Sequence, residues 1–175
     1  KGKVLLMMNN DPEDDPALFA GRTRLWYGRW DYKYDQAARH GAAGAIIIHT
    51  VPSAGYGFQV LQTSWSGEQF ALPSEGEPKV TVQAWTTEDA SRRLAALGGQ
   101  DLDALRAAAQ KKDFRPVPLG VTWSIAMANT VSRKQTANVL GRLPGSDPAL
   151  TSADIWLSPA ALFADPVGGV MQANE

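Results

Sequence analysis

The sequence has 175 residues, with 17 Lys and Arg against 18 Asp and Glu, which gives a formal net charge of −1. This length suits one medium-sized domain, or one domain with part of a second, and the near-zero charge excludes a broad basic surface for nucleic acid or anionic lipid. The absence of cysteine excludes disulfides, thiolate zinc sites and cysteine nucleophiles. Only His40 and His49 remain for catalysis or metal binding through imidazole.

The first third of the chain predicts a strand, a loop, a helix and a second strand. The apolar run at residues 4–8 indicates a strand buried on both faces, and because almost nothing precedes it we expect the chain to start inside a larger protein. Turn-forming residues at 9–16 indicate a loop, and the spacing over residues 32–44 indicates a helix that ends at Gly41. Residues 45–49 follow as an apolar strand, and this order predicts a crossover that lays the two strands parallel.

The middle of the chain predicts one further strand and two helices. Residues 55–57 and 62–77 lack a sustained period and indicate a long loop, whereas residues 80–85 alternate like a strand with one buried face. Thr86 or Thr87 is expected to cap a helix, and Asp101 is expected to open another. In the first of these helices three side chains share a face: Ala90, Leu94 and Leu97.

The last third predicts two more strands and a boundary. Residues 121–131 indicate a strand with one apolar face, formed by Val121, Trp123, Ile125 and Met127, and residues 136–140 indicate another. Turn formers follow at residues 141–148. We therefore expect a sheet-based domain at 1–140, a linker at 141–150 and a remnant or unrelated tail at 151–175. The predicted fold class is α/β to α+β, a mixed sheet with two or three flanking helices.

An acidic loop holds four carboxylates, at Asp11, Glu13, Asp14 and Asp15. Ca²⁺ takes oxygen ligands of this kind, but the loop lacks the alternating spacing and central glycine of a calcium-binding hand. We interpret it as a solvated loop that caps backbone amides or pairs with nearby arginines.

Aromatic side chains are concentrated at residues 26–34, which hold five of the fifteen in the chain. Because Trp and Tyr dominate binding energy at protein interfaces, Trp26, Tyr27, Trp30 and Tyr32 are candidate binding residues. The interpretation we favour is that two or three of these residues wedge the helix against the sheet, with a partner surface as the alternative.

His49 ends the strand predicted at residues 45–49, where open parallel sheets often place ligands. With Ser64, Ser66 and Glu68 it forms the basis of one alternative, a small hydrolase. Hydrolysis needs a nucleophile, a base and an oxyanion site within hydrogen-bond reach, and the sequence nominates at most two of these. The other interpretation of His49 is a hydrogen-bonded residue at a strand boundary.

Three strings in the sequence are similar to a known family: residues 1–12 (KGKVLLMMNNDP), 32–50 (YKYDQAARHGAAGAIIIHT) and 135–148 (QTANVLGRLPGSDP). Together they resemble the protease-associated domain inserted in bacterial zinc aminopeptidases, in the family that also includes glutamate carboxypeptidase and transferrin receptor. The similarity runs in order from Lys1 to about Leu150.

The resemblance implies an open β-sandwich or barrel-like sheet with flanking helices. It also implies a noncatalytic module that shapes substrate access or mediates contacts, with a peptidase catalytic domain or a peptide substrate as its partner. No nucleic-acid or membrane partner is expected. The parent would be a two-zinc exopeptidase, secreted or periplasmic, in which metal-bound hydroxide attacks the peptide carbonyl and a glutamate acts as general base.

The sequence departs from the family where the zinc site should begin. In the family a His-x-Asp motif follows shortly after the stretch matching residues 145–148, whereas here no histidine follows Leu150. No zinc ligand or catalytic glutamate can therefore be assigned, and we expect no cofactor in this chain. The leading hypothesis is a noncatalytic accessory module, and the alternatives are the small hydrolase and a binding domain that uses the aromatic residues at 26–34.

Overall fold

A computed structural model describes residues 1–13, 19–21, 23–71, 76–135, 141–143 and 155–157 of the chain. The chain divides into two compact units, Lys1–Ile125 and Ala126–Glu175. In the second unit β4 (Gly141–Leu143) pairs antiparallel with β5 (Ile155–Leu157), so three residues predicted to begin a linker form a strand. The rest of the predicted linker, the strand predicted at residues 136–140 and most of the predicted tail lie outside the described residues.

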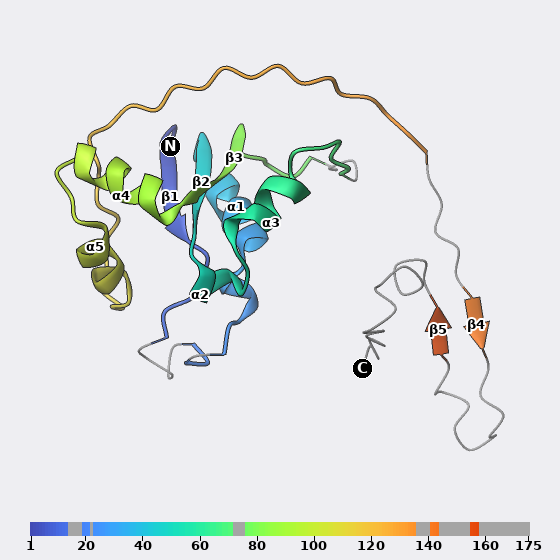
Figure 1. The fold of residues 1–175 in the computed structure, drawn as a ribbon, viewed down its shortest axis with the longest axis horizontal. Coiled ribbons are helices and arrows are strands. Elements are labelled where there is room, and N and C mark those ends of the chain that lie inside the picture. Colours follow the sequence, from blue (N-terminus) through green and yellow to red (C-terminus); the bar gives the residue numbers. More distant parts are fainter. Residues whose placement is uncertain (14–18, 22, 72–75, 136–140, 144–154, 158–175) are drawn as a thin grey trace. The chain divides into compact units, whose positions relative to one another are not determined.

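The first unit is built on a parallel sheet of three strands in the order β1-β2-β3 (Figure 1). These strands are β1 (Val4–Met8), β2 (Gly44–His49) and β3 (Val82–Thr87). Met8 lies opposite Ile48, and Ile48 lies opposite Thr86, so the three strands end together at one carboxyl end of the sheet. The parallel pairing of β1 with β2 confirms the predicted crossover, and the helices around the sheet confirm the α/β class.

One face of the sheet is covered by α1 (Trp30–Arg39). Its buried residues Tyr34, Ala37 and Ala38 belong to the same core as Ala45 and Ile47 of β2. The two β2 residues are two positions apart, as one face of a strand requires. Gly41 ends the helical segment as predicted: its φ is 74°, a left-handed conformation that glycine adopts without steric cost.

The opposite face is covered by α4 (Glu88–Leu97) and α5 (Leu102–Ala109). Ala95 and Leu102 form a second core with Ile48 of β2. Ser91 and Ala95 of α4 are fully buried, whereas Leu97 is 78% exposed. The predicted shared face was therefore wrong for Leu97, because α4 lays its small residues four positions apart toward the sheet.

The predicted starts of these two helices are confirmed. Thr87 caps α4, where its hydroxyl oxygen accepts a 3.2 Å hydrogen bond from the N–H of Ala90. Asp101 caps α5, where its carboxylate accepts hydrogen bonds from the N–H groups of Asp103 and Ala104. Both caps satisfy amides that have no carbonyl partner within the first turn of a helix.

Short helices occupy segments in which the sequence shows no period. They are η1 (Trp26–Gly28), α2 (Val51–Ala54) and α3 (Phe58–Ser64). The end of α3 overlaps the stretch predicted to be a long loop, because a helix of seven residues spans less than two full turns and leaves little periodic signal. No helix in the described part of the chain is long and apolar enough to cross a bilayer.

Residues 121–131 do not form the predicted strand. Residues 114–135 have no regular secondary structure, and the four side chains of the predicted apolar face are between 36% and 65% exposed. Alternation alone does not make a strand, because the backbone N–H and C=O groups need a neighbouring strand to bond. Among the described residues none of the strands pairs with this segment.

Candidate functional site

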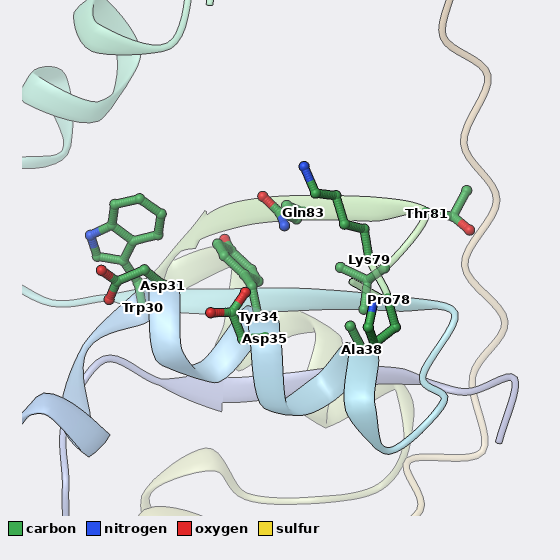
Figure 2. Close-up of a pocket in the computed structure, with 10 residues that line it drawn as sticks. Trp30, Asp31, Tyr34, Asp35, Ala38, Pro78, Lys79, Thr81 and Gln83 are labelled. Carbon is green, nitrogen blue, oxygen red and sulfur yellow. The ribbon is translucent and has the colours of Figure 1, made fainter. Parts of the chain in front are cut away.

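Two neighbouring hollows lie beside β3. This strand pairs with β2 on one side, and no strand in the described residues pairs with its other side. The first hollow has a volume of 460 Å³ and lies between α1 and the chain around β3 (Figure 2), lined by Trp30, Asp31, Tyr34, Asp35, Lys79 and Gln83 among others. The second has a volume of 320 Å³ and is lined by Phe58, Leu61, Trp65 and Trp85 among others. Tyr34 and Gln83 line both hollows, which together we call the β3 groove.

Tyr34 fixes the distance between α1 and β3 where the two hollows meet. Only 3% of the residue is exposed, and its hydroxyl donates a 2.7 Å hydrogen bond to the carbonyl oxygen of Ala84. Burial raises the pKa of Tyr34, so the hydroxyl keeps its proton and remains a donor. The centre of the groove therefore holds a hydrogen bond between α1 and β3, formed by a Tyr34 hydroxyl that stays protonated.

Trp30 holds the walls of the groove together. Its ring meets those of Tyr34, Trp65 and Trp85 edge to face, with centroid separations of 5.9, 5.7 and 6.2 Å. Aromatic pairs of this geometry contribute about 0.5–1.5 kcal/mol each beyond the area they bury. Trp30, one of the four candidate binding residues, thus links α1, α3 and β3 and also lines the first hollow.

The other three candidate binding residues lie outside the groove. Trp26 is 56% exposed, and the guanidinium of Arg29 lies 5.2 Å from the centre of its ring. Tyr27 is 52% exposed and meets Tyr32 edge to face at 5.2 Å. The aromatic residues at 26–34 therefore separate into two groove residues, Trp30 and Tyr34, and a second group of three around η1.

Charge in the first hollow is carried by two carboxylates and one ammonium. Asp31 lies 3.4 Å from the side chain of Arg29, so part of its charge is already balanced. Asp35, one helical turn further along α1, is exposed and has no ion-pair or hydrogen-bonding partner among the described residues, and Lys79 has none there either. Both groups are therefore available to a ligand.

The carboxyl end of the sheet encloses His49 in aromatic rings. His49 is 4% exposed, and its ring centre lies 5.7 Å from that of Tyr56, 5.5 Å from Phe58 and 6.4 Å from Trp85. Its Nε2 and the indole nitrogen of Trp85 are buried without a hydrogen-bonding partner in the described part of the chain. Buried polar atoms of this kind are commonly met by an internal water.

In the structure, the residues proposed to act with His49 in hydrolysis are not hydrogen-bonded to its Nε2. Ser64, Ser66 and Glu68 are exposed, at the end of α3 and just beyond it. The hydroxyl of Ser66 donates to the carbonyl oxygen of Thr63 at 3.3 Å. Because the described residues give Nε2 of His49 no partner, neither serine hydroxyl is hydrogen-bonded to that nitrogen.

The acidic loop contributes one buried carboxylate to the same end of the sheet. Asp11 is 8% exposed and accepts a 3.0 Å hydrogen bond from the N–H of Leu25, as the capping interpretation predicts. Gly28 packs against it, and a Cβ at Gly28 would lie 2.6 Å from a carboxylate oxygen of Asp11. Desolvation lowers the pKa of Lys33, although the charge of Asp11 acts in the opposite direction.

Metal binding by the acidic loop finds no support in the residues that can be placed. Within the described ranges no group of three or more His, Asp and Glu side chains is arranged to hold a metal ion. Asp14 and Asp15 lie outside those ranges.

The β3 groove was not predicted from the sequence. Its second hollow is lined by Trp65 and Trp85, which are twenty residues apart in the sequence and each contact the ring of Trp30. The sequence signal for this site was the alternation of apolar and polar residues in β3, which predicts a strand. That alternation does not indicate which edge of the strand lacks a neighbour. Comparison of the chain with family models, curated proteins and solved structures found no match.

Proposed function

We propose that this chain is a noncatalytic accessory module of a zinc-dependent aminopeptidase, of the protease-associated type, and that it holds extended peptide at the β3 groove. The observation that carries this function is the groove itself, a pair of hollows with aromatic residues in their walls, beside a strand edge that pairs with no strand in the described ranges. An exposed strand edge recognises an extended peptide through main-chain hydrogen bonds, while adjoining pockets select side chains.

The family in this proposal comes from the resemblance of the three sequence strings to the protease-associated domain. It places the chain beside a peptidase, for which an extended peptide is the natural ligand. The open sandwich or barrel-like architecture of that family belongs to the same proposal, with the parallel sheet of the first unit as one part of it. Zinc belongs to the parent enzyme and not to this chain.

The chemistry of the described residues suits binding better than hydrolysis. The one buried imidazole is enclosed by aromatic rings, and the hydroxyls proposed as nucleophiles bond to local carbonyls or face solvent. A hydrolase needs its nucleophile and base within hydrogen-bond reach of each other. An accessory role in peptide binding requires only a groove of suitable shape and backbone donors and acceptors along the strand edge.

The accessory role is tested by turnover of the whole 175-residue chain. Aminoacyl 4-nitroanilides and 4-nitrophenyl esters are incubated with the chain and with its His49→Ala variant, with and without Zn²⁺. We expect hydrolysis at the buffer rate in all four cases. Turnover that depends on zinc and disappears in the variant would overturn the noncatalytic role.

The groove is tested by peptide binding, followed through intrinsic tryptophan fluorescence. Trp65→Ala removes a wall of the second hollow at a residue that is 47% exposed, and Trp26→Ala removes an exposed tryptophan outside the groove as the matched control. We expect the first change to weaken binding of an acetylated, amidated valine- and threonine-rich hexapeptide and the second to leave it unchanged. Equal losses in both variants would exclude the groove as the binding site.

A further inference from the structure

We infer that the basic pair Arg133 and Lys134 is a processing site for proteases of trypsin-like specificity, and that cleavage there leaves the whole first unit on one product. This inference goes beyond the proposed function and does not depend on it. Its grounds are a backbone without hydrogen bonds, its exposure to solvent, and the placement of the basic residues along it.

The connection that follows α5 holds no backbone structure that a protease would have to break. Residues 114–135 have no regular secondary structure, and no hydrogen bond involves residues 116–133 in the described part of the chain. A protease binds its substrate in an extended form, so a bond in folded structure is cleaved only after local opening. Residues 116–133 are open to a protease without that step.

The same connection is accessible to solvent almost throughout. Every residue from Gly120 to Gln135 is exposed, and Val131, two positions before Arg133, is 87% exposed. Leu119 is the partly buried exception within residues 116–135, where its backbone lies against Gly98 at the end of α4. A protease can therefore approach the chain beyond this contact.

The basic residues of the connection restrict where such a protease can cut. They are Arg115, Arg133 and Lys134. A trypsin-like protease holds a basic side chain in its specificity pocket through a buried carboxylate. The bond after Arg115 leads into Pro116, whose ring nitrogen carries no hydrogen and resists this cleavage. The bonds after Arg133 and Lys134 are the ones that remain.

Several exposed basic residues elsewhere lie in hydrogen-bonded structure instead. Arg39 and Arg93 belong to α1 and α4. Lys111 and Lys112 lie in a turn, in which the N–H of Phe114 donates a 3.1 Å hydrogen bond to the carbonyl oxygen of Lys111. Cleavage at these residues requires local unfolding first, so it should be slower than cleavage at the pair.

The modification is hydrolysis of one peptide bond. The serine of the protease takes over the acyl group of Arg133 while the C–N bond breaks and the nitrogen of Lys134 gains a proton; water then releases the acyl group as a carboxylate. The larger product ends at Arg133 and keeps all residues that line the β3 groove. Cleavage would thus detach the groove from β4 and the residues that follow.

The test is limited digestion of the whole 175-residue chain with trypsin, sampled over time, with the products identified by intact mass. We expect the first product to end at Arg133 or Lys134, and to form at least about ten times faster than any product of cleavage within α1 or α4. The double variant Arg133→Gln, Lys134→Gln should lose this product. Arg93→Gln, an exposed change on α4, is the matched control and should keep it.

Hydrogen exchange provides a second measurement that needs no protease. The amides of residues 120–133 are expected to exchange at the rate of an unstructured peptide, whereas those of β2 should be protected. A first cut at any other basic residue, or an unchanged digestion pattern in the double variant, would overturn the inference. Protection of residues 120–133 equal to that of β2 would overturn it as well.

Discussion

The hydroxyl of Tyr34 donates a 2.7 Å hydrogen bond to the carbonyl oxygen of Ala84, and this bond ties α1 to β3 at the point where the two hollows of the groove meet. The partners are fifty residues apart in the sequence and come from different elements. Such a bond is well placed to hold the shape of the groove, because a shift of α1 along the sheet would break it.

Tyr34→Phe is expected to lower the free energy of unfolding by about 1 kcal/mol, since the hydroxyl is lost and a partly buried carbonyl loses its partner. Urea unfolding followed by circular dichroism measures the change. Tyr32→Phe, in a residue whose ring meets Tyr27 near η1, is the matched control and should have a smaller effect. An equal loss of unfolding free energy in the Tyr32→Phe control would show that the hydrogen bond of Tyr34 does not contribute specifically to stability.

Trp30 and Trp26 are expected to differ sharply in their contribution to stability, although the sequence places them together. Trp30→Ala removes three edge-to-face contacts and should cost about 3 kcal/mol. Trp26→Ala removes an exposed ring and a single guanidinium contact, and should cost about 0.5–1 kcal/mol at most. The comparison is made by urea unfolding, and similar losses would contradict the division of the aromatic residues into groove and surface.

The elements of the sheet could be predicted because each is encoded locally. β-branched and apolar runs mark β1 and β2, the left-handed Gly41 ends the helical segment, and Thr87 and Asp101 cap the helices that follow. Caps and apolar runs involve residues within four positions of one another, so the sequence alone displays them.

The candidate site could be predicted only in part because it is assembled from distant residues. Trp30 stands out within an aromatic stretch, but Trp65 and Trp85 acquire a role only when α3 and β3 approach it. The strand predicted at residues 121–131 fails for the same reason: alternation records which side chains share a face, and pairing depends on a neighbour that the local sequence does not specify.

Substitutions on the buried and the exposed side of α4 are expected to differ in their effect on stability. Ala95 is fully buried against the sheet, so Ala95→Leu should overpack the core and lower the free energy of unfolding by about 1–3 kcal/mol. Leu97→Ala, at a residue that is 78% exposed, should change it by no more than about 0.5 kcal/mol. Thermal or urea unfolding measures both changes. A larger loss of stability in the Leu97 variant would support the buried face that the sequence predicted, with Leu97 in it.

Acid should weaken the contact between α4 and α5 through Asp103. Two hydrogen bonds from Arg92, of 2.7 and 2.8 Å, hold the pKa of the Asp103 carboxyl below its usual value. Because the folded-state pKa is the lower one, the stabilisation is present above the unfolded pKa of about 3.9 and is lost as the pH falls through the folded value. Asp103→Asn should therefore be less stable than the native chain at pH 7, by a small amount since the pair is exposed, and the difference should close below about pH 4. Urea unfolding from pH 7 to pH 3 at low salt measures this, and a difference that stays constant over the range would show that the carboxyl does not titrate in the way its two hydrogen bonds require.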